Sequence, residues 1–268
     1  MATKKSVTKA SAASGKVTPA PVPATAASAP VLALSEVGRE VFSALVNFSK
    51  ADLQATLGGD TMSQFDFDRI KIPAGGSTVW ELPSIEGTDA AKDFAGVVIE
   101  QKILRVYWPD RGDKNAEPVP PSCASDEGGY RGFGDPGGIC AECPNAQWGS
   151  DPRGGRGKAC KEVRVLYIIR EGNILPDVMI LPPTSIKPWR QFCQRLLKRQ
   201  VGLQKVLVAF TLDTDKNADG QKYSKVNPQV LGQLSAEDKV RVAAYREAML
   251  PVLKAPDIRS TEASGDEE

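Results

Sequence analysis

Four of the five cysteines follow a symmetrical spacing in the middle of the chain. Cys123, Cys140, Cys143 and Cys160 are arranged as Cys-x16-Cys-x2-Cys-x16-Cys. A structural zinc ion is held by four tetrahedral ligands, and the Cys-x2-Cys step lets two thiolates reach one ion while neighbouring amides point at sulfur. The spacing therefore predicts one structural Zn²⁺ bound by these four cysteines.

The segment that carries these cysteines, residues 109–161, is dense in glycine, proline and charge and poor in aliphatic residues. Such a stretch cannot form an ordinary core, whereas metal binding can supply folding free energy on the order of 10 kcal/mol. A redox or disulfide pair and an iron–sulfur cluster are the alternatives. Redox Cys-x2-Cys pairs usually open a helix after a strand, but Pro144 and glycines surround this one. Cys193 is expected to pack inside a helix.

Histidine is absent from the sequence. Its absence removes Ser-His and Cys-His nucleophile pairs, histidine bases and histidine metal ligands, so we expect a protein that is not an enzyme. A carboxylate-metal nuclease that uses Asp66, Asp68 or Glu81 is the remaining catalytic hypothesis. These acids are equally explained as solvent-facing positions on strands.

Basic residues gather in two places, although the net charge is only +1. No acid occurs from Val178 to Leu212, where a predicted helix from Ser185 to about Gln200 has a cationic face opposite an apolar one. A second cluster adjoins Cys160, where zinc would make a phosphate-contacting loop rigid. An ordinary solvated helix face is the alternative for the first cluster. The basic residues expected to contact nucleic acid are Arg153, Arg156, Lys158, Lys161, Lys187, Arg190, Arg195, Lys198 and Arg199.

Aromatic residues are concentrated in or beside the cysteine-bearing segment, where there is little core to absorb them. They are Tyr107, Trp108, Tyr130, Phe133 and Trp148. Proteins that bind single strands stack such side chains on bases, at about 1–3 kcal/mol per base. The alternative is that they pack around the zinc as a miniature core, and Trp148 fits either role.

The remaining pattern predicts an α+β, strand-rich domain. Strands are expected near Phe65–Ile72 and Thr78–Trp80 and from Val97 to Trp108, and hairpins from Val163–Arg170 with Ile174–Leu181 and from Leu203–Leu212 with Tyr223–Val230. Ser35, Ser185 and Ser235 are expected to cap helices. We predict an OB-like antiparallel curved sheet or barrel over residues 32–256, with flanking helices and with the zinc-binding loop inserted at 109–161.

Both ends of the chain have biased composition. Residues 1–31 carry lysine, alanine, proline and serine without acids, and are predicted to form a disordered basic arm. Residues 257–268 are predicted to form a disordered acidic tail. The first thirty residues lack a long continuous apolar segment, so we expect a cytoplasmic protein without membrane association, in the host cytoplasm if it is viral.

The strand-rich domain, the cysteine-bearing insertion, the adjacent basic and aromatic residues and the acidic tail together resemble phage-type, OB-fold single-stranded DNA-binding proteins. The resemblance covers the architecture from about residue 60 onward. The zinc site of that family mixes histidine with cysteine, whereas this sequence has four cysteines and no histidine. It implies coating of single-stranded DNA in phage replication or recombination, with the tail contacting replication proteins. The other functional hypothesis is a zinc-stabilised adaptor that binds proteins and has little affinity for nucleic acid.

Overall fold

The computed structural model describes residues 35, 66–109, 121–152, 154, 156–217 and 220–253. All of them belong to a compact unit that spans Ala33–Glu268. The predicted basic arm (1–31), the predicted acidic tail (257–268) and the helix expected after Ser35 lie outside the described residues.

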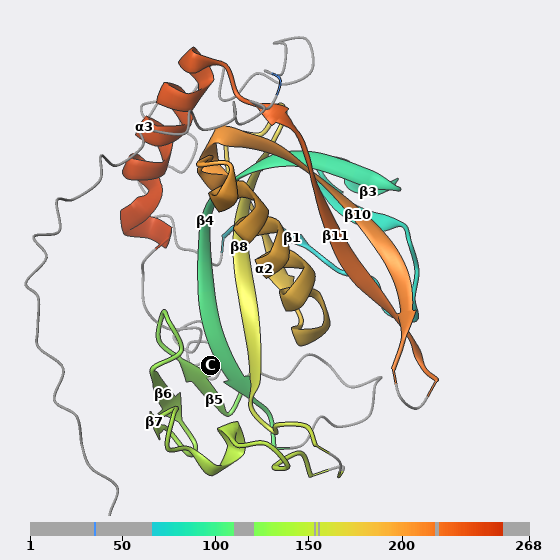
Figure 1. Cartoon of the computed structure of the whole chain (residues 1–268), viewed down its shortest axis with the longest axis vertical. Coiled ribbons are helices and arrows are strands. Elements are labelled where there is room, and N and C mark those ends of the chain that lie inside the picture. The colour runs from blue at the N-terminus through green and yellow to red at the C-terminus, as the bar shows by residue number, and fades with distance from the viewer. Residues whose placement is uncertain are drawn as a thin grey trace, which may run out of the picture. The chain divides into compact units, whose positions relative to one another are not determined.

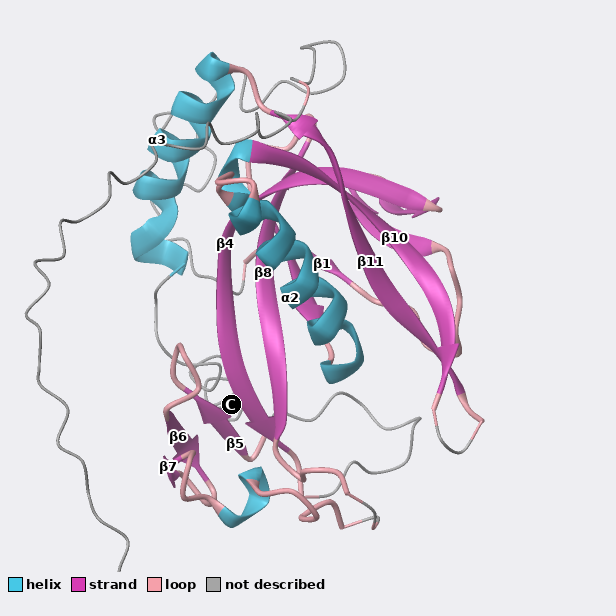
Figure 2. Ribbon diagram, viewed as in Figure 1, coloured by secondary structure: helices cyan, strands magenta, loops and turns pink. Residues whose placement is uncertain are grey.

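Two antiparallel hairpins and one long strand make up most of the main sheet (Figures 1 and 2). Strand β4 (Asp93–Tyr107) pairs along most of its length with β8 (Lys161–Arg170), which forms a hairpin with β9 (Asp177–Leu181). The second hairpin consists of β10 (Val206–Lys216) and β11 (Lys222–Gln233), and β10 pairs with the first residues of β4. The sheet is therefore assembled around β4.

Shorter strands extend this sheet at both ends. Strand β1 (Arg69–Ile70) pairs in parallel with β9. At the far end of β4, the strands β5 (Cys123–Ser125), β6 (Arg131–Gly134) and β7 (Gly138–Ile139) follow one another in antiparallel order. A separate hairpin joins β2 (Trp80–Ser84) to β3 (Gly87–Ala91).

Each face of the main sheet is covered by a helix and has its own hydrophobic core. Helix α2 (Pro183–Lys198) buries Trp189, Phe192 and Leu196 against a face that includes Leu166 and Ile168. Helix α3 (Ala236–Leu253) buries Val242, Tyr245 and Met249 against the opposite face, which includes Val165 and Tyr167. Successive residues of β8 therefore contact different cores, which is why this strand is apolar along its second half.

The helix cap predicted from the sequence is confirmed for α3 and is wrong for α2. The Ser235 hydroxyl accepts a hydrogen bond from the Asp238 N–H (3.0 Å), as expected of a residue that caps α3. The expected cap at Ser185 is wrong, because α2 begins at Pro183 and the Ser185 hydroxyl accepts the Val226 N–H (3.1 Å) from β11. A proline fits the first turn of a helix because that turn does not need its N–H.

The expected fold class is confirmed: the described chain is α+β and strand-rich, and its main sheet is mostly antiparallel. The two predicted hairpins and the long central strand are present, with β9 beginning at Asp177 rather than at Ile174 and residues Leu203–Lys205 forming a short 3₁₀ helix, η2. Among the described strands the pairings form an open, branched sheet whose path runs from β1 to β7, and β11 pairs only with β10. None of the described helices combines the length and the apolar character needed to cross a membrane.

Candidate metal centre and nucleic-acid interface

The four spaced cysteines lie on separate pieces of the segment that follows β4, here called the cysteine module (residues 121–161). Cys123 begins β5 and stands opposite Tyr107 in the sheet register. Cys140 follows β7, and Cys143 precedes the 3₁₀ helix η1 (Pro144–Ala146). Cys160 directly precedes β8. Strand pairing therefore brings together residues that are far apart in the sequence.

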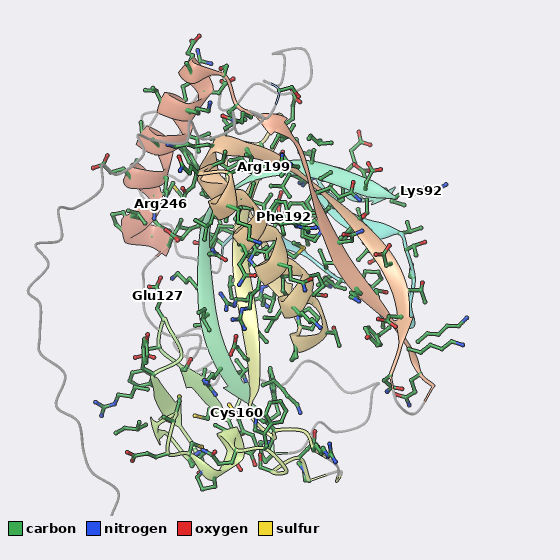
Figure 3. All side chains as sticks on the ribbon, viewed as in Figure 1. Lys92, Glu127, Cys160, Phe192, Arg199 and Arg246 are labelled. Carbon is green, nitrogen blue, oxygen red and sulfur yellow. The ribbon has the colours of Figure 1, made fainter. Side chains whose placement is uncertain are left out.

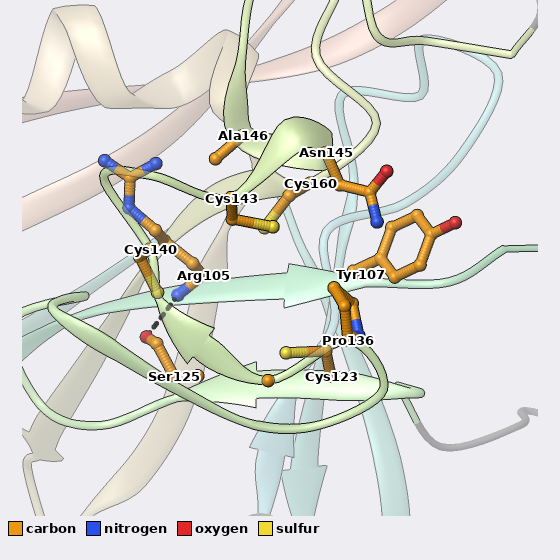
Figure 4. Close-up of a pocket in the computed structure, with 12 residues that line it drawn as sticks. Arg105, Tyr107, Cys123, Ser125, Pro136, Cys140, Cys143, Asn145, Ala146 and Cys160 are labelled. Carbon is orange, nitrogen blue, oxygen red and sulfur yellow. Dashed lines mark hydrogen bonds between the residues drawn. The ribbon is translucent and has the colours of Figure 1, made fainter.

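All four cysteines line one cavity of about 10 Å³, and their side chains point inward (Figure 4). A cavity of this size is close to the smallest that holds one water molecule. Cys123, Cys140 and Cys160 are buried, and Cys143 is half-buried. The structure thus brings the four residues that the sequence singled out to the lining of one small cavity.

The electrostatics of the cavity disfavour several bare thiolates. Burial raises the pKa of Cys160 to about 11, with a further rise from Cys140, and Arg105 acts in the opposite direction. Burial also raises the pKa of Cys140, and Cys123 and Cys143 contribute to that rise. A bound cation would relieve this repulsion, because thiolate is the form that ligates metal.

Backbone contacts hold the cysteines in place. The Cys160 N–H donates to the Asn145 carbonyl (2.7 Å), and the Cys143 carbonyl accepts from the Ala146 N–H (3.0 Å). Gly132 leaves room for sulfur, because a Cβ atom there would lie 2.9 Å from the Cys123 Sγ. The cavity is therefore bordered by fixed backbone, and its shape depends on one glycine.

The donor set fits zinc, but the side chains are not arranged as a finished metal site. Within the described part of the chain, no three His, Cys, Asp or Glu side chains are placed so that they could hold a metal ion as they stand. All five cysteines are free thiols in the structure. Asp66, Asp68 and Glu81, the acids of the nuclease hypothesis, are exposed. Zinc binding by the four cysteines therefore stays a prediction.

The aromatic residues of the predicted interface divide into two groups. Tyr130 and Trp148 are 76% and 78% exposed, and Phe133 is 44% exposed. Tyr107 and Trp108 are half-buried, and Tyr107 lines the cysteine cavity. The Lys158 Nζ lies 4.9 Å from the centre of the Trp148 ring. Tyr107 therefore lies beside the cysteines, as in the alternative of a miniature core, whereas Tyr130 and Trp148 expose their rings to solvent.

The basic residues of the module differ in their exposure and in the contacts that they already make within the protein. Arg156 is exposed, and Lys158 is half-buried beside Trp148. The Lys161 Nζ donates to the Asp151 carboxylate (2.8 Å) and to the Lys158 carbonyl, so this lysine stabilises the module itself. Arg153 lies outside the described residues. Within this cluster, Arg156 and Lys158 are the cations best placed for an external anion.

Helix α2 has the two faces that the sequence predicts. Ile186, Trp189, Phe192 and Leu196 are buried, and Cys193 is half-buried against the same core, where burial raises its pKa to about 11. The cations on the outer face and directly after the helix are all exposed, and they are Lys187, Arg190, Arg195, Lys198 and Arg199. Figure 3 labels Phe192, within α2, and Arg199, which directly follows it.

Two groups of residues near these sites are not predicted by any pattern in the sequence. Arg105, on β4, lines the cysteine cavity. Asn227 and Gln229, on β11, line a hollow beside α2. No local signal marks these residues, because their places depend on strand register and on the packing of α2 against β11.

No protein-family model matches the chain, and no curated protein or solved structure matches it either.

Proposed function

We propose that this protein binds single-stranded DNA in replication or recombination, and that a zinc ion holds the cysteine module in its binding conformation. The observation that carries the proposal is the exposure of Tyr130 and Trp148, more than three-quarters each, on a module with four converging cysteines. Exposed rings beside cations suit stacking on bases, because every base has a π face. The contacts of Lys158 with Trp148 add a positive charge next to one such ring.

Cys123, Cys140, Cys143 and Cys160 would hold the zinc ion. When bound, a structural zinc ion contributes folding free energy to a segment that buries little apolar surface. In the proposed complex, side chains of the module contact the DNA directly. Tyr130 and Trp148 stack on bases, and Arg156 and Lys158 attract phosphates. The exposed cations of α2 extend the positive surface beyond the module.

The likeness to OB-fold, phage-type single-stranded DNA-binding proteins belongs to the same proposal. The antiparallel sheet built around β4 supports it, as does the position of the module at one end of that sheet. Sequence-tolerant coating of DNA is what this likeness implies, together with recruitment of replication proteins by the acidic residues at 257–268.

Tryptophan fluorescence tests the proposal directly. Trp80 and Trp189 are buried and Trp108 is half-buried, so Trp148 is the tryptophan best exposed to an added ligand. Thymidine-rich single strands should quench its emission, and their affinity should fall with rising salt. Trp148→Ala should remove most of the quenching and weaken binding roughly 5- to 150-fold, which corresponds to about 1–3 kcal/mol for one stack.

Ile85→Ala is the matched control, because Ile85 is a fully exposed apolar side chain in the β2–β3 turn, outside the module. It should leave both quenching and affinity unchanged. Duplex binding as tight as single-strand binding would refute the proposal. Absence of oligonucleotide binding by a folded protein would instead favour the adaptor hypothesis, in which the exposed rings contact a protein.

A further inference from the structure

A hollow of about 530 Å³ lies between the C-terminal half of α2 and the middle of β11. Its volume falls in the range of pockets that hold small molecules, and it is large enough for a nucleotide. Three exposed cations border it: Arg195 and Lys198 of α2, and Arg199, which directly follows the helix. Neither α2 nor β11 contains an acidic residue, so no carboxylate on these two elements opposes the cations.

The rest of the hollow is not charged. Phe192, Leu196 and Pro228 are buried beneath it, and Val230 is half-buried at its side. Asn227 and Gln229 add two side-chain amides. This combination suits a nucleotide. The cations can bind its phosphate, the apolar floor can pack against its base, and the side-chain amides can hydrogen-bond to the edge of the base.

A smaller hollow of about 340 Å³ lies along the N-terminal half of α2 and is bordered by Lys187 and Arg190. It also includes Glu162, whose carboxylate is 3.5 Å from the Arg164 guanidinium and so is partly neutralised. Glu162 is two residues beyond Cys160, which places this hollow at the end of β8 that adjoins the cysteine module. The α2 cations thus follow a helix of about 24 Å that leads away from the module.

We infer that the hollow between α2 and β11 binds phosphates and a base of single-stranded nucleic acid, as a second contact separate from the rings of the cysteine module. This inference rests on the proposed function. Arg195, Lys198 and Arg199 contact the phosphates, and the apolar floor receives a base. A strand that reaches from the module to the hollow is held at two points, so short oligonucleotides bind much more weakly than long ones.

The test is the salt dependence of binding by the variant Lys198→Gln/Arg199→Gln. Each phosphate contact with a single strand contributes about 0.7 to the slope of log K against log salt. The double variant should therefore lose about 1.4 from that slope and bind thymidine oligonucleotides about 25-fold more weakly at 0.1 M salt than the wild type. Quenching of Trp148 at saturation should be retained, because the module is unchanged.

Lys92→Gln/Lys222→Gln is the matched control, since both lysines are exposed and lie away from the hollow. It should leave the slope unchanged. An unchanged slope in the α2 variant, with intact wild-type binding, would overturn the inference and leave the proposed function standing. Absence of wild-type binding would overturn both. Binding of an acidic peptide that Lys198→Gln/Arg199→Gln abolishes, with oligonucleotide binding unaffected, would assign the hollow to a protein partner and overturn the inference.

Discussion

Ser235 stabilises the first turn of α3 through two hydrogen bonds to one residue. Its hydroxyl accepts the Asp238 N–H and donates to the Asp238 carboxylate (2.8 Å), and that carboxylate is almost fully buried. We expect Ser235→Ala to lower the free energy of unfolding by about 1–2 kcal/mol, because it removes a helix cap and leaves a buried carboxylate with fewer donors. Urea denaturation measures this change.

Ser235→Thr keeps the hydroxyl and should retain most of the stability. Equal stability of Ser235→Ala and the wild type would show that the cap contributes nothing to folding.

Ser235 and Ser185 show which residue roles can be predicted from sequence. Ser235 is followed three residues later by Asp238, so its cap is a local pattern that the sequence displays. Ser185 is the second residue after a pair of prolines, and its hydroxyl accepts the N–H of Val226, 41 residues away, which no local pattern displays. The same distinction applies to the cysteine cavity. The spacing of the four cysteines could predict that they lie together, whereas Arg105 lines the cavity only because of the strand register.

Lys102 joins two secondary-structure elements, β4 and the end of α3. Its side chain is 5% exposed, and its ammonium donates to the Leu253 carbonyl and lies 5.8 Å from the centre of the Tyr167 ring. A cation at a helix C-terminus is favoured by the helix dipole and by the free carbonyls there. We expect Lys102→Met to lower the free energy of unfolding by about 1–3 kcal/mol and to speed hydrogen exchange in the last turn of α3.

Glu127→Gln is the control, because Glu127 is nearly half exposed and lies 3.9 Å from the Lys102 ammonium. An ion pair with an exposed carboxylate contributes little to the free energy of unfolding. Exchange in α3 that is the same in Lys102→Met and in the wild type would contradict the role assigned to Lys102.

The elements that could be predicted are those with a long pattern of their own. Strands β4 and β8, the β10–β11 hairpin and the two-faced helix α2 each carry a run of apolar residues with the right period. Strand β3 and strands β5 to β7 are short and rich in glycine or polar residues, so no sequence pattern predicts them. They pair because β2 and the end of β4 present an edge to them, which is a tertiary effect.

The two hydrophobic cores and the cysteine module are distinct parts of the described chain. None of the residues that form the two cores belongs to the cysteine module. All of them lie before residue 121 or after residue 161. The sequence indicated this division, since residues 109–161 are poor in aliphatic side chains. It could not indicate how β5 continues the main sheet, because that depends on the pairing of Cys123 with Tyr107.

This division predicts that metal removal loosens the module and spares the rest of the sheet. The purified protein should contain about one zinc ion per chain, measured by elemental analysis. Chelation under reducing conditions should release the zinc and make the cysteine module sensitive to protease, while the far-ultraviolet circular dichroism changes little. Single-strand binding should weaken, because Tyr130 and Trp148 lose their fixed positions. Cys140→Ser/Cys143→Ser should reproduce these effects, whereas Cys193→Ser, which alters a thiol of α2 packed against the core, should keep the zinc. A protein without zinc, or protease sensitivity that chelation does not change, would contradict the proposed metal centre, since the module would then be held by its backbone pairing alone.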